Sequence, residues 1–365
     1  MMTMNINIKK KNNCIGAALL ASALALVISL LPACSSTQVI NISTIFAMDT
    51  IMELEVQGDE QLLSQAEQKI REIENTLSVT KKNSEIGTLN DNKKAKFSAE
   101  SGKILEGALD VCKETGGKLD ISIYPVLKEW GFTTGEYRVP DDEELAVLVD
   151  KVDYGKIDLK KLNDGSFEVT IPDDMQIDLG SVVKGYTGSY LANFFKENGV
   201  TSGLINLGGN VECIGNKPDG TPWKVAIKSP FSDSKSGMLG VFEATDTSVI
   251  TSGGYERFFE KDGEVYWHIL DPETGKPSRN GLASVTVIGD NGLMDDGLST
   301  ALFVMGTEDA VDFIKKHALG SREKAGFGAI LVTEDKKVYI TEDIAAKFSL
   351  SAEYSGLEVS VINIK

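Results

Sequence analysis

Residues 177–186, IDLGSVVKGY, combine an acid, a glycine, and a serine three positions before a lysine. If a helix begins here, Ser181 and Lys184 lie on neighbouring turns, and proton transfer from a serine nucleophile to its base is geometrically allowed. Acyl-transfer enzymes with Ser-x-x-Lys also need Ser-x-Asn and then Lys-Thr/Ser-Gly further along. In this chain residues 235–237 (KSG) precede residues 278–280 (SRN), which is the reverse order. Acyl transfer is therefore disfavoured, although labelling of Ser181 by a β-lactam would revive it.

The same stretch also suits a phosphate or a pyrophosphate. We expect Asp178 to end a strand, Gly180 to permit a tight turn, and the following helix to aim free N–H groups at that turn. Lys184 adds a cation beside it. Taken alone, this stretch is better explained as a capped helix with a solvated lysine, so the later segments decide.

Two later segments carry further polar side chains. In residues 292–300, GLMDDGLST, a helix beginning near Asp296 would place its carboxylate and the Thr300 hydroxyl on one face. Such hard oxygen ligands, completed by a backbone carbonyl and phosphate oxygens, fit Mg²⁺. The alternative is an N-cap aspartate and a core-facing threonine. His268 lies on an expected strand before a Pro/Gly turn, but a lone histidine is more often structural than catalytic.

The N-terminus predicts export. Three lysines at residues 9–11 precede an apolar run over residues 14–31, and then come Pro32, Ala33 and Cys34. A basic region, an apolar region and a small residue before a cysteine predict a lipoprotein signal peptide over residues 1–33. Cys34 would carry the lipid, residues 34–44 would be a polar tether, and residues 45–365 the catalytic domain. A transmembrane anchor is the alternative, although the run is at the short limit for spanning a bilayer.

The charge of the chain excludes some partners. Loss of residues 1–33 removes three lysines and no acid, so the formal net charge changes from −17 to −20. An acidic body argues against nucleic acid or anionic lipid as a partner. Its two cysteines, Cys112 and Cys213, stand in separate apolar segments and form neither a metal motif nor a disulfide framework.

Helix and strand patterns alternate irregularly along the chain, which predicts an α+β fold without a Rossmann or P-loop motif. The helix over residues 180–198 is expected to bury Val182, Tyr186, Tyr190 and Phe194. Other expected helices are 61–79, 103–112, one from residue 140, 296–304 and 308–318. Expected strands are 203–207, 224–227, 265–269, 284–288 and 329–332.

Taken in order, nine segments resemble the ApbE-like family, the FAD:protein FMN transferases. Each segment alone is weak evidence, but the ordered set covers nearly all of the mature chain and is highly specific. Many family members are exported lipoproteins, which agrees with Cys34. The segments are residues 46–50 (FAMDT), 83–90 (NSEIGTLN), 119–132 (LDI to WGF), 177–186, 206–210 (NLGGN), 251–257 (TSGGYER), 268–275 (HILDPETG), 284–287 (SVTV) and 296–300 (DGLST).

The resemblance implies a single α+β catalytic body with mixed sheets and packed helices, and with FAD in a cleft between two halves. FMN would pass from FAD, the substrate, to a Thr or Ser hydroxyl of an acceptor protein through a phosphoester bond, and AMP would leave. The pyrophosphate would lie near a Mg²⁺ held by the side chains of Asp296 and Thr300 and the backbone carbonyl of Ser181, with Ser299 nearby. Ser181 is then a ligand-site residue rather than a nucleophile.

The resemblance also implies roles for the residues around FAD. His268 is the candidate general base for the acceptor hydroxyl, a role that contributes roughly 10²–10⁴-fold. Lys184 would neutralise charge on the pyrophosphate, and Asp271 and Arg257 would support the site. The implied cofactor-binding residues are Met48, Thr80, Leu119, Asp120, Ile121, Asp178, Lys184, Arg257 and Ile269.

Thr80 departs from the family pattern, because many transferases have an aromatic residue there that would lie against FAD. Some relatives instead hydrolyse FAD to FMN and AMP, so hydrolysis is an alternative, as is a lipoprotein that binds flavin without catalysis. The expected acceptors are exported FMN-binding-domain proteins of electron-transfer systems. The expected location is the extracytoplasmic face of the cell membrane, through the lipid on Cys34.

Overall fold

The computed structural model describes residues 39–320 and 326–364, and residues Ile40–Lys365 form one compact unit. The predicted signal peptide and Cys34 lie outside the described residues. In the described ranges, no helix is both long enough and apolar enough to cross a bilayer.

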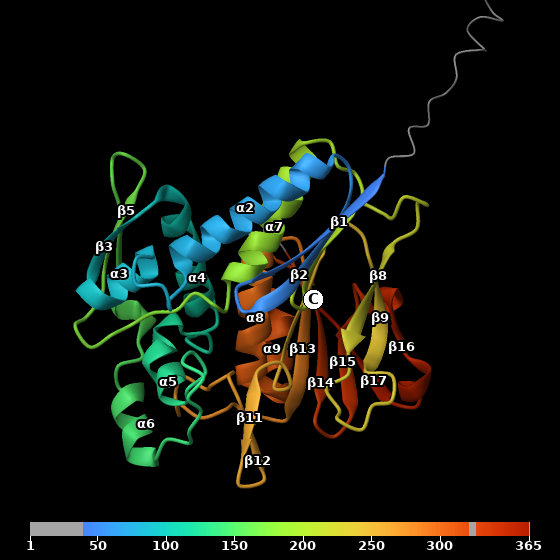
Figure 1. Ribbon diagram of the computed structural model, residues 1–365. Helices are drawn as coiled ribbons and strands as arrows, with labels where there is room; N and C mark the ends of the chain where they lie inside the picture. Colours follow the sequence, from blue (N-terminus) through green and yellow to red (C-terminus); the bar gives the residue numbers. More distant parts are fainter. Residues whose placement is uncertain (1–38, 321–325, 365) are drawn as a thin grey trace, which may run out of the picture. The chain divides into compact units, whose positions relative to one another are not determined.

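Nine strands of the described chain form one large sheet (Figure 1). Neighbouring strands are antiparallel except for the last pair, β15 and β17, which is parallel. Across the sheet the order is β1 (Ile40–Ala47), β2 (Thr50–Gln57), β6 (Gly203–Leu207), β7 (Asn210–Ile214), β10 (Ser248–Gly253), β13 (Leu282–Gly289), β14 (Gly328–Thr333), β15 (Lys337–Thr341) and β17 (Glu358–Ile362).

Smaller sheets flank the large one. β16 (Phe348–Leu350), β9 (Met238–Ala244) and β8 (Trp223–Lys228) form one of three strands. β3 (Lys94–Phe97), β5 (Phe167–Thr170) and β4 (Asp158–Lys161) form another. β11 (Phe258–Lys261) and β12 (Glu264–Trp267) form a hairpin.

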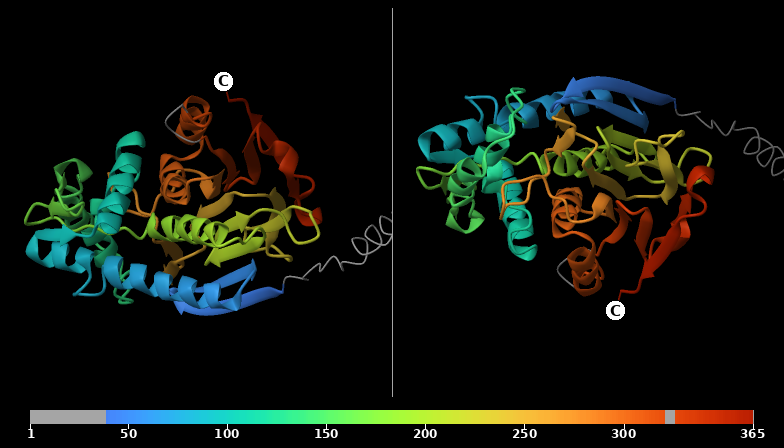
Figure 2. Two further views of the ribbon diagram at one scale, coloured as in Figure 1. Left: turned by 90° about the horizontal axis from the view of Figure 1, so that it is seen from above. Right: turned by 90° about the horizontal axis from the view of Figure 1, so that it is seen from below.

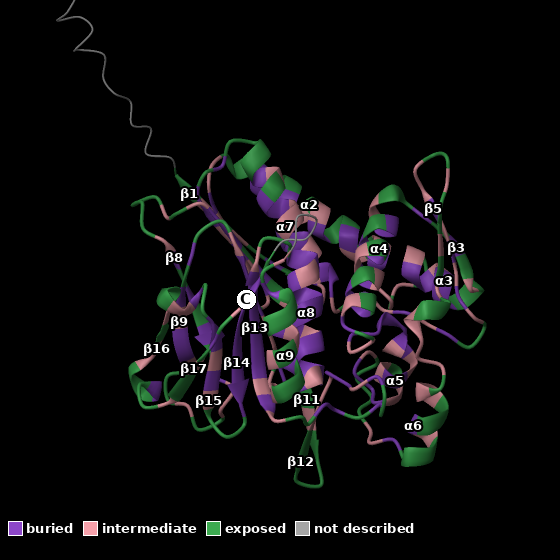
Figure 3. Ribbon diagram, turned by 180° about the vertical axis from the view of Figure 1, so that it is seen from behind, coloured by how far each residue is buried: buried purple, intermediate pink, exposed green. Residues whose placement is uncertain are grey.

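The helices are α2 (Glu60–Leu77), α3 (Glu85–Asn92), α4 (Ala99–Glu114), α5 (Tyr124–Glu129), α6 (Asp142–Val149), α7 (Val183–Glu197), α8 (Gly292–Met305) and α9 (Thr307–His317). Short 3₁₀ turns lie at Ile121–Ile123, Tyr154–Lys156, Ala345–Lys347 and Ala352–Tyr354. Most of α8 is buried, and it contacts both α7 and the large sheet (Figure 3).

The large sheet is covered on both faces at β13, as the alternation along that strand shows. Val285 and Val287 pack in a core with α8 and α9, whereas Ile288 packs in a core with β8 and β9. Successive side chains of a strand point to opposite faces, so at β13 helices cover one face and the three-stranded sheet of β16, β9 and β8 covers the other. The α+β prediction is confirmed.

The structure revises two expectations near the site and the N-terminus. α7 begins at Val183 rather than Gly180 and buries Gly185, Gly188 and Leu191 instead of the expected Tyr186, Tyr190 and Phe194, which are half-buried. At Gly185 only a residue without a side chain allows the close contact with α8, and the rings of Tyr186, Tyr190 and Phe194 lie outside this buried face. β1 begins at Ile40, so residues 40–44 of the expected tether are part of the sheet.

Candidate functional site

The site is built where α7 and α8 make backbone contact. A Cβ atom on Gly185 would lie 1.9 Å from the carbonyl oxygen of Gly292, and one on Gly292 would lie 2.3 Å from that of Gly185. Neither position has room for a side chain. The two glycines therefore let the first turn of α7 rest directly on α8.

This contact brings the Asp296 carboxylate to the N-terminus of α7. The backbone N–H of Gly185 donates to Oδ2 of Asp296 at 2.8 Å. Burial raises the pKa of Asp296, whereas Lys184, the facing amide of Asn210 and this N–H favour its charged form. The cap of α8 is Asn291, five residues earlier, so Asp296 is not an N-cap residue.

Hydroxyl groups line α8 next to this carboxylate. The Oγ atom of Ser252 on β10 lies 2.7 Å from Oγ of Ser299 and 3.3 Å from Oγ1 of Thr300. Ser299 also donates to the backbone carbonyl of Asp296 at 2.8 Å and is fully buried. The half-buried Thr300 is four residues after Asp296 and shares its side of the helix.

These groups fit a hard divalent cation. No group of three or more His, Cys, Asp or Glu side chains suited to a metal occurs in the described part of the chain, so a dedicated protein cage is not formed there. Mg²⁺ commonly takes one or two carboxylates and completes its shell with water and substrate phosphates. Asp296 and Thr300 offer such oxygen donors, and a cation would offset the cost of burying the Asp296 charge. Ser181 is half-buried in the turn before α7.

His268 is close enough to Lys184 for the charge of Lys184 to act on its imidazole ring. It follows β12 rather than lying in the strand, because β12 ends at Trp267. Its backbone N–H donates to the Arg257 carbonyl at 3.1 Å, and its Nδ1 lies 3.2 Å from the same oxygen. A carbonyl oxygen only accepts, so we assign the proton to Nδ1, which leaves Nε2 as the basic nitrogen.

Two cations influence this imidazole. Burial, followed by the charges of Arg257 and Lys184, lowers the pKa of His268 to about 3. The ring is therefore neutral at physiological pH. Arg257 is itself held by a hydrogen bond from Nη2 to the Phe132 carbonyl at 2.8 Å.

Asp178 stands in an extended segment that is not part of a sheet, contrary to the expected strand end. Asn90 anchors this segment, because its side-chain amide both donates to and accepts from the backbone of Ile177, each at 2.8 Å. The N–H of Asp178 donates to the Ile121 carbonyl at 2.9 Å. Burial raises the pKa of Asp178, and the Gly180 N–H and Arg257 oppose that shift.

Several expected site residues already have local structural partners. One Asp120 oxygen accepts from the N–H and the hydroxyl of Ser122, and the other accepts from the N–H of Tyr154. Asp271 accepts from the N–H of Glu273 within its turn. The hydroxyl of the exposed Thr80 lies 3.0 Å from that of Ser78.

The apolar members of the expected set lie in the cores around the site. Leu119, Ile121 and Ile269 are buried. Met48 is half-buried at the β1–β2 turn and packs against two cores. The FAD cleft expected between two halves stays a prediction.

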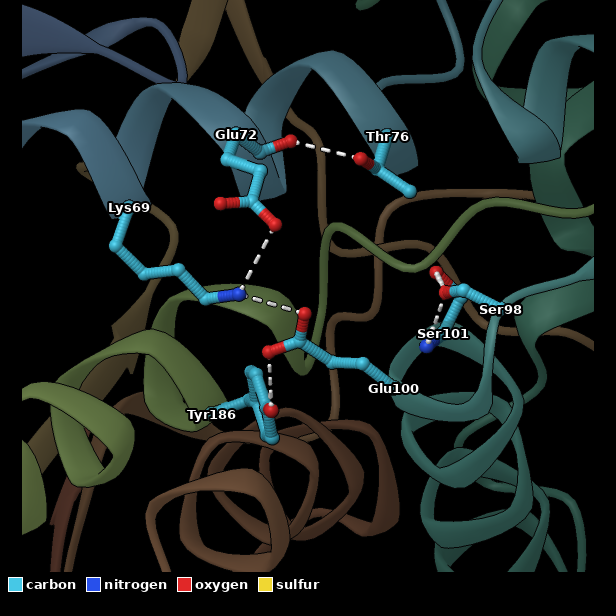
Figure 4. Close-up of polar contacts among 7 residues, drawn as sticks. All are labelled: Lys69, Glu72, Thr76, Ser98, Glu100, Ser101 and Tyr186. Carbon is cyan, nitrogen blue, oxygen red and sulfur yellow. Dashed lines mark hydrogen bonds and ion pairs between the residues drawn. The ribbon is translucent and has the colours of Figure 1, made fainter. Parts of the chain in front are cut away.

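A polar network supports α7 from the side (Figure 4). Glu100 of α4 pairs with Lys69 of α2 at 2.7 Å and accepts from the Tyr186 hydroxyl at 2.8 Å. Lys69 also pairs with Glu72 at 3.3 Å. Tyr186 is two residues after Lys184, so this network ties the first turns of α7 to two other helices.

Sequence reasoning gave no role to Asn90, Asn210 or Ser252. All three stand in short motifs with a nearby glycine, but a polar residue in such a motif does not reveal its partner. Asn210 is 5% exposed and faces Asp296, yet its Nδ2 has no partner with hydrogen-bond geometry among the described residues.

Comparisons with known proteins agree on one family. The model of the ApbE family matches residues 48–321. A protein of Vibrio cholerae named FAD:protein FMN transferase is 30% identical over 271 residues, which are 73% of this chain and 79% of that protein. One of that name from Haemophilus influenzae is 29% identical over 81% of this chain and 89% of its own. The crystal structure of the ApbE protein from Thermotoga maritima has a TM-score of 0.76 and 27% identity, and covers 85% of this chain and 99% of that one.

Proposed function

Because the chain belongs to the ApbE family, we propose that it transfers FMN from FAD to a hydroxyl side chain of an acceptor protein. The curated relatives named FAD:protein FMN transferase support this activity. The observation that carries the proposal is that the charge of Lys184, at the start of α7, acts both on Asp296, which accepts from the Gly185 N–H, and on His268.

The reaction follows from the groups at this place. The acceptor Thr or Ser oxygen attacks the phosphorus on the FMN side of the FAD pyrophosphate. A bond forms between that oxygen and phosphorus, the pyrophosphate P–O bond breaks, and AMP leaves with the bridging oxygen. The hydroxyl proton passes to Nε2 of His268. Lys184 and the N–H groups of α7 attract the phosphate oxygens.

Mg²⁺ is the proposed cofactor. It would be held by Asp296 and Thr300, with Ser181 contributing its carbonyl and Ser299 lying behind them. When bound, it supplies positive charge that neutralises the phosphate oxygens of the transition state. The buried, oxygen-rich surroundings of Asp296 support this assignment.

FAD hydrolysis is the second candidate. Thr80 is exposed and short, and no aromatic ring is provided at this position to lie against FAD. Water that reached the phosphorus would give free FMN and AMP. A flavin-binding protein without catalysis would leave FAD intact.

We further propose that Cys34 carries a lipid that holds the enzyme on the extracytoplasmic face of the membrane, where exported FMN-binding-domain proteins would be its acceptors. Residues 31–34, LPAC, support the anchor.

The test is incubation with FAD and Mg²⁺, with and without an exported FMN-binding-domain protein. Transfer predicts that AMP appears in step with an acceptor mass gain equal to FMN. AMP and free FMN without a mass gain would identify a hydrolase. Intact FAD would leave a flavin-binding protein or a transferase that needs another acceptor.

A further inference from the structure

Exposed apolar side chains concentrate on one face of the β1–β2 hairpin. Five of the twelve large apolar residues that are exposed in the described ranges lie between residues 39 and 51. Four of them are strand residues: Ile40 is 43% exposed, Ile42 61%, Phe46 66% and Ile51 67%. Single exposed apolar residues are ordinary, but a group of this kind indicates a contact surface.

Strand geometry places these four on the same face. Ile40, Ile42 and Phe46 are spaced by even numbers along β1, and Phe46 pairs with Ile51 of β2. The opposite face is occupied, because Ile45 and Ala47 pack in a core with α2. We call the exposed group, Ile40, Ile42, Phe46 and Ile51, the hairpin face. β1 is also the edge of the large sheet, and its blue strand lies on the outside of the unit in both views of Figure 2.

We propose that the hairpin face rests on the surface of the membrane to which Cys34 is anchored. The proposal rests on the lipid anchor put forward above. Ile40 follows Cys34 by six residues, and a chain of that length spans at most about 20 Å even when fully extended. The start of β1 is therefore kept close to the bilayer, and β1 carries the exposed apolar side chains.

Charge on the hairpin indicates which lipid it accepts. Glu53 and Glu55 of β2 pair with Thr44 and Ile42 and share their face. Carboxylates are repelled by anionic headgroups, so the hairpin face suits neutral lipid. Membrane contact would come from the apolar area of the hairpin face that is removed from water, and anionic lipid would weaken it.

This orientation has a consequence for the reaction. The hairpin turn at Met48 and Asp49 follows β1, whose eight residues span about 26 Å. Met48 is one of the expected flavin contacts. The site would therefore stand near the bilayer surface, within reach of acceptors that are themselves attached to the membrane.

The test uses the full, processed lipoprotein in phosphatidylcholine vesicles. A cysteine replaces Ile42 and carries an environment-sensitive NBD dye, while the native thiols of Cys112 and Cys213 are buried. The matched control is Val361→Cys, because Val361 is 50% exposed on β17 at the other edge of the same sheet. The mass of the N-terminal peptide shows whether Cys34 is acylated. FMN transfer measured in detergent shows whether the enzyme is active. Loss of the lipid anchor and loss of the proposed activity are therefore detected independently of membrane contact by the hairpin face.

The proposal predicts that dye at position 42 emits at shorter wavelength and is quenched by nitroxide lipids, while dye at 361 is not. Replacing a third of the lipid with phosphatidylglycerol should reduce the quenching. Equal, unquenched emission at both positions overturns the proposal. A blue shift at 42 that depends on protein density and not on lipid nitroxides also overturns it, because a second copy would then cover the face.

Discussion

The backbone N–H of Gly185 donates to the Asp296 carboxylate at 2.8 Å, across the contact between α7 and α8. A carboxylate is stabilised at a helix N-terminus because free N–H groups and the helix dipole face it. Gly185 and Asp296 thus join α7 to α8 and place a negative charge next to the proposed binding position of the phosphate and the metal.

A methyl group at position 185 should break this arrangement. Gly185→Ala places Cβ against the Gly292 carbonyl, so the helices must separate. We expect a loss of about 1–3 kcal/mol of unfolding free energy, as for other overpacked cores, together with loss of activity. Urea denaturation and FMN transfer measure the two effects.

The matched control is Gly188→Ala in the same helix, where the nearest atom to the added Cβ is 3.6 Å away. It should retain activity and stability. If Gly185→Ala behaved like this control, the close contact would not be what builds the site.

Asp296→Asn should remove the carboxylate charge at the proposed metal position while keeping the size of the side chain. Loss of the carboxylate charge should lower kcat by roughly 10²-fold or more, since a metal contributes several kcal/mol to the transition state. The Mg²⁺ concentration for half-maximal rate should rise. Titration of Mg²⁺ at saturating FAD measures both.

The neighbouring Asp295→Asn is the control for that variant. Burial raises the pKa of Asp295 to about 8, and its carboxyl accepts from the Ser248 hydroxyl at 2.6 Å. It is therefore largely protonated at pH 7, and an amide should replace it with little loss. Equal losses in the two variants would argue against a special role for Asp296.

His268→Gln should remove the base and change the pH profile. We expect a decrease of roughly 10²–10⁴-fold in kcat. In the free enzyme the pKa of His268 is lowered to about 3 by burial, Arg257 and Lys184, so kcat/KM should show no acid limb from this group between pH 5 and 8. Bound FAD phosphates would offset the charges of Arg257 and Lys184 and raise the pKa of His268. The acid limb of the kcat profile should therefore lie at higher pH than that of kcat/KM.

Initial rates over a pH series measure these limbs. His317→Gln, at the end of α9, serves as the control and should keep the wild-type profile. An unchanged acid limb of kcat in His268→Gln would assign that limb to another group.

Glu212 should make stability depend on pH. Burial raises its pKa to about 7, above the value of about 4.3 for an unfolded chain. The folded state therefore binds more protons, and the stability contribution is full below about pH 4 and is lost as pH rises through 7. Glu212→Gln should flatten this decline by roughly 1–3 kcal/mol in urea denaturation measured from pH 5 to 8. A decline of unchanged size would mean that Glu212 is charged in the folded protein.

The sequence allowed the regular elements to be predicted where periodicity was strong. In α2, within the expected helix 61–79, the apolar residues that recur at helical spacing are all buried: Leu62, Leu63, Ala66, Ile70, Ile73 and Leu77. In α7 the prediction followed the large side chains, whereas the buried face includes Gly185, which packs against α8, and Gly188, which faces Glu212 of β7 and Leu207 of β6. The spacing of large apolar residues does not predict a buried helix face that is formed by small residues such as glycine.

Only part of the candidate site could be predicted from the sequence. The relation of Asp296 to Thr300 follows from helix geometry within one element. By contrast, the Asn90 anchor on Ile177 joins residues 87 positions apart, and the Arg257 carbonyl beside His268 Nδ1 depends on the β11–β12 hairpin. Such partners are set by tertiary packing, which no local pattern encodes.

The central claim is that residues around the start of α7 transfer FMN to a protein hydroxyl. We would measure AMP release and acceptor mass together, in single-turnover reactions with FAD and Mg²⁺, for the wild type and His268→Gln. We expect one AMP per FMN attached in the wild type, and both products should form more slowly by the same factor in the variant. AMP release at the wild-type rate in His268→Gln, or acceptor flavinylation without AMP, would contradict it.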